Sequence, residues 1–474
     1  MMMIYLSCFL NFAPSSSYTP QRKLFFGVIL SLLVTLTSAT GSEAKELFPT
    51  YPNIEANVRF WEDVYSFYST RQGILHDKDN LQIIYTVVDL VDWNSPGSAR
   101  INKKLVKLAR QRYKKILTDL GSGRKPVTPE EKKVASLFPG RSRHAFNMAK
   151  NNIRLQIGQK DRFLEGIIRS GAYMPSIRKI FKTYNLPAEL AYLPHVESSF
   201  NPKAHSKAGA AGLWQFTRST GRQYLTINSV IDERYDPYSS SKAAAVFLKE
   251  NYKALRSWPL AITAYNYGRA GMLRAQKKNG SYDKIFKNHK TKIFKFASRN
   301  FYPEFLAAMR VAQRLEHNKN ITLDRPEATL SVRMKGYVPA EDIRHHFIVS
   351  EEDFSRLNPA LRKPVLSGKK YIPKNFLVRL PATKLTRQLA GNIPSSIFLP
   401  RQVRDKIYVV RRGDTAGLIA RKYGISLSEL IQANNLNRRA TIRIGQKLKI
   451  PGKIHLASNA NIVILEAVSK KRPN

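Results

Sequence analysis

One glutamate occupies a position that suits a general acid. Glu197 lies in the segment 186–216, LPAELAYLPHVESSFNPKAHSKAGAAGLWQF. Leu190, Leu193 and Glu197 stand at i, i+3 and i+7, so the glutamate projects from the side of a helix that the leucines bury. An Asn-Pro pair at 201–202 ends this helix, which places Glu197 in or near its last turn.

Two features of this position raise the pKa of a carboxyl group. Apolar surroundings disfavour the charged form, and the negative end of the helix dipole opposes a second negative charge. A carboxyl group that stays protonated near neutral pH can act as a general acid. Pro194 kinks the helix and loosens the assignment of its faces, so the alternative is a solvated Glu197 at the helix edge.

The residues that follow Glu197 suit the binding of a bulky sugar. Positions 208–212 are all Ala or Gly, which lets the backbone approach a large ligand closely; the alternative is tight helix packing. Trp214-Gln215 then places an aromatic face beside an amide, a common pairing for sugar rings and their hydroxyl groups. A later helix, begun near Trp258, ends in AYNYG at 264–268 and would return a phenol and an amide to the same cleft.

Taken in this order, the E-S, G-L-W-Q and A-Y-N-x-G motifs resemble those of the lytic murein transglycosylases, which have the soluble lytic transglycosylase (goose-type lysozyme-like) fold. The resemblance is greater to the membrane-bound type D subfamily, and it covers Pro187 to about Leu306. Trp214 stands where the family commonly has Met. A family tyrosine shortly before a proline would align with Phe301, beside Tyr302, in NFYPEF.

The resemblance implies a chemistry with a single catalytic carboxyl group. Ordinary glycosidases use two carboxylates, but Glu165, Glu233 and Asp236 lie outside recognisable motifs. Glu197 would protonate the oxygen between MurNAc and GlcNAc. As the carboxylate it would then take the proton from the C6 hydroxyl group, which closes onto C1 and gives 1,6-anhydro-MurNAc without water. No metal or organic cofactor is needed.

The resemblance also assigns the substrate-binding residues. Ser198 and Gln215 would orient the N-acetyl sugar, Tyr265 would support the oxocarbenium-like centre or Glu197, and Asn266 would support the cleft. The full predicted set is Ser198, Gly212, Leu213, Trp214, Gln215, Tyr265, Asn266, Gly268, Phe301 and Tyr302. Two other readings remain open: a non-catalytic scaffold that binds the cell wall, and a hydrolytic, lysozyme-type muramidase on the same fold.

A second motif lies at 408–451, YVVRRGDTAGLIARKYGISLSELIQANNLNRRATIRIGQKLKIP. Asp414 or Thr415 caps a first helix and Ser426 caps a second, between two short strands. This β-α-α-β plan is similar to a LysM domain, which binds glycans that contain N-acetylglucosamine. The glycan-binding residues carried over from that family are Gly413, Asp414, Thr415, Asn435, Ile442 and Ile444. The alternative is a module that only packs against its neighbour.

The predicted fold class is mainly α, a lysozyme-like helical domain followed by small α+β modules. Before that domain, Thr128, Pro129 and Glu131 predict the start of a helix with a capping box. The predicted boundaries are 1–44 for an export segment, 45–173 for a helical N-terminal region, 174–318 for the catalytic domain, 325–384 for a degenerate LysM-like module, 385–404 for a linker, 405–452 for the LysM domain and 453–474 for a tail.

Charge and the export segment predict where the chain works. The 474 residues include 79 Lys and Arg against 34 Asp and Glu, a formal net charge of +45, which attracts polyanions. Arg22 and Lys23 precede the apolar run 24–39, as in a secretory signal; an uncleaved anchor is the alternative. The single cysteine, Cys8, excludes an internal disulfide and thiolate-rich metal sites.

Export disfavours nucleic acid as the polyanion and favours the periplasm or cell envelope. The expected partners are therefore peptidoglycan glycan strands and an anionic membrane surface, and the chain is expected to be a monomer.

Overall fold

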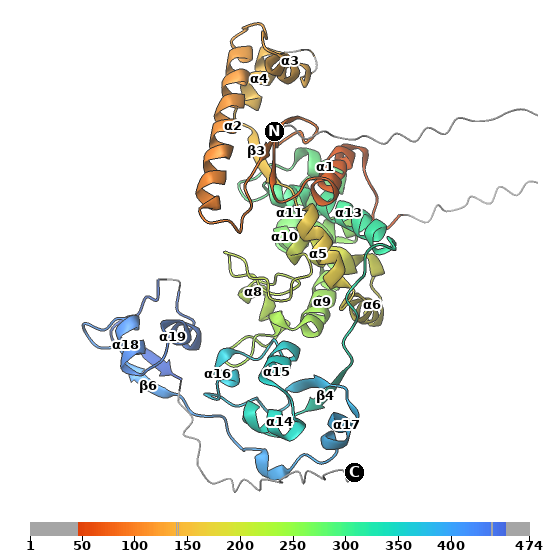
Figure 1. Cartoon of the computed structure of the whole chain (residues 1–474). Helices are drawn as coiled ribbons and strands as arrows, with labels where there is room; N and C mark the ends of the chain where they lie inside the picture. The colour runs from red at the N-terminus through yellow and green to blue at the C-terminus, as the bar shows by residue number, and fades with distance from the viewer. Residues whose placement is uncertain (1–45, 139, 141, 438, 452–474) are drawn as a thin grey trace, which may run out of the picture. The chain divides into compact units, whose positions relative to one another are not determined.

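The computed structural model describes residues 46–451, apart from positions 139, 141 and 438 (Figure 1). The predicted export segment, with Cys8, and the predicted tail lie outside these residues. The predicted fold class is confirmed, because helices predominate here and the strands form small antiparallel sheets. Nowhere in this part of the chain is a helix both long enough and apolar enough to cross a bilayer.

One hydrophobic core joins helices from two distant parts of the chain. The long helix α13 (Phe296–Glu316) packs along α1 (Glu55–Ser66), and both contribute buried side chains to the core (Figure 1). The N-terminal region therefore shares its packing with the predicted catalytic domain. The other elements around this core are η1 (Pro52–Ile54), α5 (Lys160–Ser170), α6 (Met174–Thr183), η3 (Ala188–Tyr192), α7 (Leu193–Ser198), α8 (Arg218–Gly221), η4 (Glu233–Tyr235), α9 (Pro237–Leu255), α10 (Trp258–Tyr267), α11 (Arg269–Asn279) and α12 (Tyr282–Asn288).

A three-stranded antiparallel sheet interrupts the N-terminal region, which the sequence analysis predicted to be helical. Its strands β1 (Gln72–Asp77), β2 (Ile84–Asp89) and β3 (Ile153–Ile157) lie in the order β2-β1-β3. The central strand is buried on both faces: Ile74 joins the core around α13 and Leu75 joins a second core. Such a strand lacks the polar–apolar alternation that identifies a half-exposed strand, which explains the error.

The second core lies under three helices between β2 and β3. They are α2 (Ser98–Gly121), α3 (Pro129–Ser136) and α4 (Arg143–Ala149). The predicted capping box is confirmed: the Thr128 hydroxyl accepts a hydrogen bond from the Glu131 backbone N–H, and the Glu131 carboxylate accepts one from the Thr128 N–H.

The C-terminal third contains two small modules of similar plan. The first has β4 (Thr329–Arg333), α14 (Ala340–Phe347), α15 (Glu351–Leu357), α16 (Lys363–Leu366) and β5 (Leu377–Pro381), with β4 and β5 antiparallel. The second has β6 (Lys406–Val409), α18 (Ala416–Lys422), α19 (Leu427–Asn434) and β7 (Lys447–Ile450), with β6 and β7 antiparallel. Its β-α-α-β plan is the predicted one, and Thr415 and Ser426 cap its helices.

The predicted linker, 385–404, is not an extended tether in the structure. It contains most of α17 (Lys384–Ala390) and the short helix η5 (Ser395–Ile397). Leu389, Ile393 and Phe398 pack against the core of the first module, and the Leu399 N–H donates to the Tyr337 carbonyl at 2.6 Å. The segment is thus folded onto that module.

Candidate active site

Glu197 lies in the last turn of α7, as predicted. The chain before it forms two short pieces, η3 and then α7, with Pro194 in the first turn of the second, where a proline is tolerated. Leu190 and Leu193 are fully buried, and Glu197 is half-buried. Ser199, with φ near +49°, ends the helix in the left-handed conformation.

Glu197 is set up to hold its proton at neutral pH. Burial, and secondarily the charge of Glu304, raises the pKa of its carboxyl group to about 8. Both effects penalise the carboxylate. A group with this pKa is protonated at pH 7, and its conjugate base is strong enough to take a proton back. One residue can therefore serve as acid and then as base.

Two hydroxyl groups hold the chain segment that faces Glu197. The Ser198 hydroxyl donates to the Leu213 carbonyl at 2.8 Å, and the Tyr265 phenol donates to the Trp214 carbonyl at 2.8 Å. The Gln215 amide donates to the Gly212 carbonyl at 2.9 Å. The G-L-W-Q motif is thereby fixed next to Glu197 through its own backbone.

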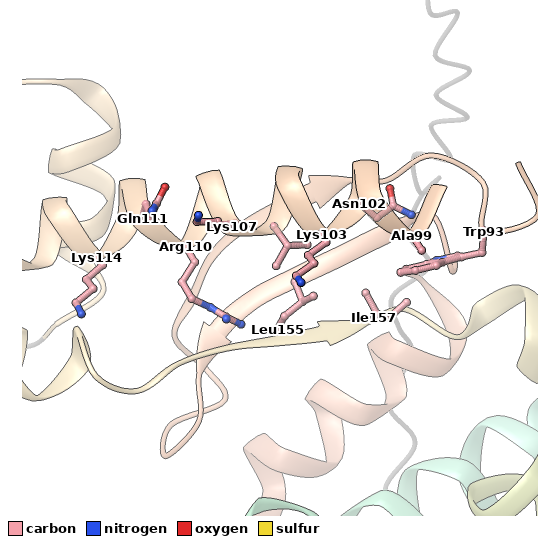
Figure 2. A pocket seen from close by; sticks show the side chains of 11 residues that line it. Trp93, Ala99, Asn102, Lys103, Lys107, Arg110, Gln111, Lys114, Leu155 and Ile157 are labelled. Carbon is pink, nitrogen blue, oxygen red and sulfur yellow. The ribbon is translucent and has the colours of Figure 1, made fainter. Parts of the chain in front are cut away.

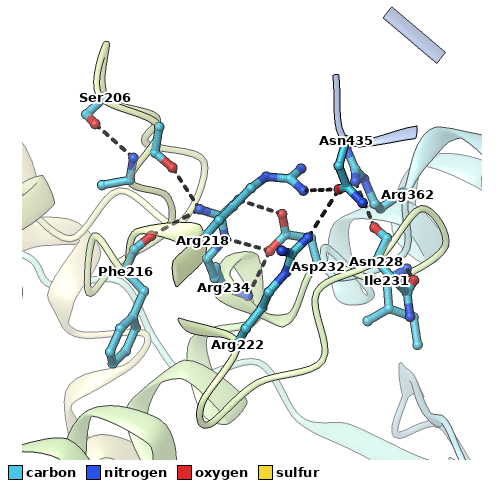
Figure 3. Close-up of polar contacts among 12 residues, drawn as sticks. Ser206, Phe216, Arg218, Arg222, Asn228, Ile231, Asp232, Arg234, Arg362 and Asn435 are labelled. Carbon is cyan, nitrogen blue, oxygen red and sulfur yellow. Dashed lines mark hydrogen bonds and ion pairs between the residues drawn. The ribbon is translucent and has the colours of Figure 1, made fainter. Parts of the chain in front are cut away.

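Arg234 holds the backbone just before and just after the same segment (Figure 3). Its guanidinium forms a buried ion pair with Asp232 at 2.8 Å and donates to the carbonyls of Gly209 (2.8 Å) and Phe216 (3.1 Å). Gly212 lies against the Arg234 backbone: a Cβ atom there would stand 1.7 Å from the Arg234 carbonyl oxygen. The lack of a side chain at 212 is therefore needed for close packing within the chain, which was the alternative to close approach of a ligand.

The structure removes three predicted residues from the ligand-contacting surface. The prediction that Trp214 offers its face to a sugar is wrong, because its ring is fully buried, is stacked on Phe181 and donates from Nε1 to the Ser241 hydroxyl at 2.8 Å. The Leu213 side chain is also fully buried, so only its main chain is available. Tyr302 is buried, and its hydroxyl donates to the Pro49 carbonyl at 2.9 Å. The sequence motifs do not indicate whether these side chains point into the core or toward a ligand.

The remaining predicted residues surround Tyr265. The Phe301 ring is nearly parallel to that of Tyr265, with centroids 6.4 Å apart, so it supports the phenol from behind. Asn266 is exposed and its side-chain oxygen accepts from the Ser298 hydroxyl at 2.7 Å. Gly268, with φ near +90°, ends α10.

Two residues missed by the sequence analysis lie in the same region. Glu304 is half-buried on α13, and Tyr65 of α1 donates a hydrogen bond to its carboxylate at 3.0 Å. Burial raises the pKa of Glu304 to about 7, although the Tyr65 hydrogen bond and the charge of Arg154 oppose this. The available signal was a lone acid within the apolar run FYPEFLAAM, three residues after Phe301.

The predicted glycan-binding residues of the second module fall into two groups. A surface cavity of about 590 Å³ is lined by Asn435 and Ile444, together with Asn434, Leu436, Asn437, Thr441, Arg443 and Gln446. Gly413, Asp414, Thr415 and Ile442 do not line it. Asp414 instead accepts hydrogen bonds from the Tyr408 hydroxyl (2.8 Å) and the Arg411 N–H (2.7 Å), which fixes the turn before α18.

A separate groove lies between α2 and β3 (Figure 2). Lys103, Arg110 and Lys114 point from α2 toward β3, over a floor that includes Leu155 and Ile157. Its volume is about 440 Å³, and none of the predicted site residues lines it. It is therefore distinct from the Glu197 region.

Comparison with known proteins finds two matching domains along the chain. Residues 175–288 match the Transglycosylase SLT domain, and residues 408–451 match the LysM domain. The chain is 29% identical over 294 residues to the membrane-bound lytic murein transglycosylase D of Escherichia coli K12, a match that covers 60% of this chain and 64% of that protein. It is 28% identical over 145 residues to the membrane-bound lytic murein transglycosylase F of Yersinia pestis Pestoides F, covering 27% and 28%. The chain thus spans less than two thirds of these relatives.

Proposed function

We propose that this chain is a lytic murein transglycosylase of the cell envelope, which cleaves the bond between MurNAc and GlcNAc and leaves 1,6-anhydro-MurNAc ends. The observation that carries the proposal is Glu197, a half-buried acid with its pKa raised to about 8, inside the region that matches the SLT domain. Relatives named as lytic murein transglycosylases support the substrate class.

In the first step, protonated Glu197 donates its proton to the glycosidic oxygen. The bond from this oxygen to C1 breaks, GlcNAc leaves with a free hydroxyl group, and positive charge develops at C1 of MurNAc. The new carboxylate is poorly solvated, so it is a strong base and also stabilises the neighbouring positive charge.

In the second step, the Glu197 carboxylate takes the proton of the MurNAc C6 hydroxyl group, and the C6 oxygen bonds to C1. The acid is regenerated, no water is consumed, and the atoms balance. A second carboxylate that activates water is not required, in contrast to hydrolytic glycosidases.

The residues around Glu197 present acceptors and a rigid wall to the sugar. The Ser198 hydroxyl hydrogen is used on the Leu213 carbonyl, so its oxygen is left to accept from the N–H of an N-acetyl group. The Gln215 side-chain oxygen is available in the same way, because its nitrogen donates to Gly212. Tyr265 forms the wall beside Glu197. Its hydroxyl group donates to the Trp214 carbonyl, and its ring packs against Phe301.

Product mass tests this chemistry directly. Purified glycan strands digested with the protein are expected to yield fragments ending in 1,6-anhydro-MurNAc, each lighter by one water than the reducing-end product of hydrolysis. Mass spectrometry of the fragments measures this difference. Only reducing ends would establish the hydrolytic alternative, and no release of fragments would leave the scaffold alternative.

We also propose that the second module binds glycan through the cavity beside Asn435 and Ile444. A second binding module raises the local concentration of the catalytic region on an insoluble polymer. Replacing Ile444, which is 72% exposed in that cavity, by Ala is expected to weaken sedimentation with insoluble murein several-fold. Cleavage of soluble fragments is expected to stay unchanged.

The matched control is Ile407→Ala, at a 57% exposed isoleucine on β6 of the same module that does not line the cavity. Equal sedimentation of both variants with murein would contradict glycan binding at this cavity.

A further inference from the structure

A second carboxyl group lies close to Glu197. Glu304 stands on α13 one turn after Phe301, and α13 packs against both α7 and α1. The charge of Glu304 raises the pKa of Glu197, and the charges of both glutamates raise the pKa of Tyr65. Tyr65, which donates to Glu304 at 3.0 Å, is therefore near both carboxyl groups.

The environments of the two carboxyl groups differ. Glu304 accepts the Tyr65 hydrogen bond and feels the positive charge of Arg154 on β3, whose guanidinium lies 3.9 Å above the Phe296 ring. The Glu197 carboxylate has no hydrogen bond or ion pair with any residue that the structure describes. Glu304 is thus the better site for a negative charge.

Asp63 of α1 is a further acid, and burial raises its pKa. Several other charged groups on the elements packed around α13 are paired elsewhere. They are Glu62 of α1, bound to Arg310 and Arg314; Tyr192 of η3, bound to Glu316 and Arg178; and Arg169 of α5, bound to Glu165 and the Ser199 carbonyl. Tyr265 of α10 faces Glu197 and donates to the Trp214 carbonyl. His195 of α7 is buried and neutral, because burial lowers its pKa to about 3.

We propose that Glu304 is a positioning residue of the proposed reaction: its carboxylate, held by the Tyr65 hydrogen bond and favoured by the positive charge of Arg154, keeps the proton on Glu197. Two carboxylates this close in a poorly solvated site cannot both ionise readily, so charge on one retains the proton on the other. The inference rests on the proposed function, because it concerns the protonation state in which Glu197 acts as an acid.

The alternative role for Glu304 is a purely structural tie between α13 and α1. Glu304→Gln distinguishes the electrostatic role from the structural one. The Gln oxygen still accepts the Tyr65 hydrogen bond, while the negative charge is lost. The matched control for loss of one carboxylate is Glu352→Gln, at an exposed position on α15.

The test is the pH dependence of murein cleavage by the wild type and both Gln variants. For Glu304→Gln, the alkaline fall in rate is expected to move to lower pH by about one to two units, the size of a charge interaction over several ångströms at an effective dielectric constant near 20. Its rate at pH 8 would then drop about five- to fiftyfold, with little change near pH 5. Glu352→Gln is expected to follow the wild type.

An unchanged alkaline limb of the pH–rate profile, or an equal loss of rate at every pH, would overturn the inference.

A second measurement is independent of activity: a carboxyl ¹³C NMR titration of the glutamate-labelled wild type, with Glu197 assigned through Glu197→Gln. We expect Glu304 to ionise before Glu197, and ionisation of Glu197 first would refute the proposal even if Glu304→Gln fails to fold. A wild type without murein activity would instead refute the proposed function, while this titration would still decide the coupling.

Discussion

Glu197→Gln is expected to abolish glycan cleavage and to make the folded protein more stable. The amide cannot protonate the glycosidic oxygen or take the C6 proton, so both steps lose their proton carrier. General acid–base catalysis contributes about 10²–10⁴-fold per group, and here one group serves twice, so a loss of at least about 10³-fold is expected. Release of soluble fragments from murein measures it.

The stability gain follows from the pKa of Glu197. The value is about 8 in the folded protein and 4.5 for an ordinary glutamate, so the folded state holds a proton that the unfolded state has released between these pH values. The stability of the wild type therefore falls as pH rises through this window. Gln has no such proton, and Glu197→Gln is expected to be more stable by about 4 kcal/mol near pH 8, with little difference near pH 4.5.

Thermal unfolding at several pH values tests the stability claim. Glu165→Gln is the matched control, because the Glu165 side chain is 65% exposed and its ion pair with Arg169 is at the surface. Full activity of Glu197→Gln would remove this residue from the reaction. A stability gain that does not grow with pH would mean that Glu197 is not protonated in the folded state.

Gly212→Ala is expected to have the second largest effect. A Cβ atom at this position would stand 1.7 Å from the Arg234 carbonyl oxygen, and the backbone φ of +76° is unfavourable for alanine. The Arg234 backbone cannot retreat easily, since its side chain is fixed by the buried pair with Asp232. We expect a loss of about 3 kcal/mol or more in the free energy of unfolding.

Activity is expected to fall with stability in this variant. The G-L-W-Q segment would move away from Ser198 and Tyr265, and a displacement of about 1 Å at a reacting site can cost about 10²-fold in rate. Gly209→Ala provides the control, because its φ of +87° is similar but nothing lies within 4 Å of the added carbon. Denaturant unfolding measures stability and murein cleavage measures activity. Equal results for Gly212→Ala and Gly209→Ala would show that contact with the Arg234 backbone does not matter.

Local sequence patterns predicted the features that depend on neighbours along one helix. The face and the final turn occupied by Glu197, the capping box at Thr128 and the helix caps at Thr415 and Ser426 are all contacts within a few residues. Their geometry is set by helix periodicity and by unpaired backbone N–H groups, which a sequence displays directly.

Features that depend on distant partners could not be predicted in this way. The direction of Trp214 is set by Phe181 and Ser241, and the double burial of β1 is set by two separate cores. Glu304 becomes notable only because α1 brings Tyr65 to it from more than two hundred residues away. A tryptophan beside a glutamine in sequence gives no information on which side of the backbone remains open to a ligand.

The packing of α1 along α13 limits how this catalytic region can be exchanged between proteins. The stretch that matches the SLT domain, 175–288, begins after α1 and ends before α13. Recombination confined to that stretch would leave one flank of the shared core facing water and would separate Glu197 from Glu304. The smallest unit that can be transferred is therefore the longer stretch from about residue 48 to the end of α13. A graft made at the edges of the matched region would contain Glu197 but lack the α1 and α13 residues that pack around it.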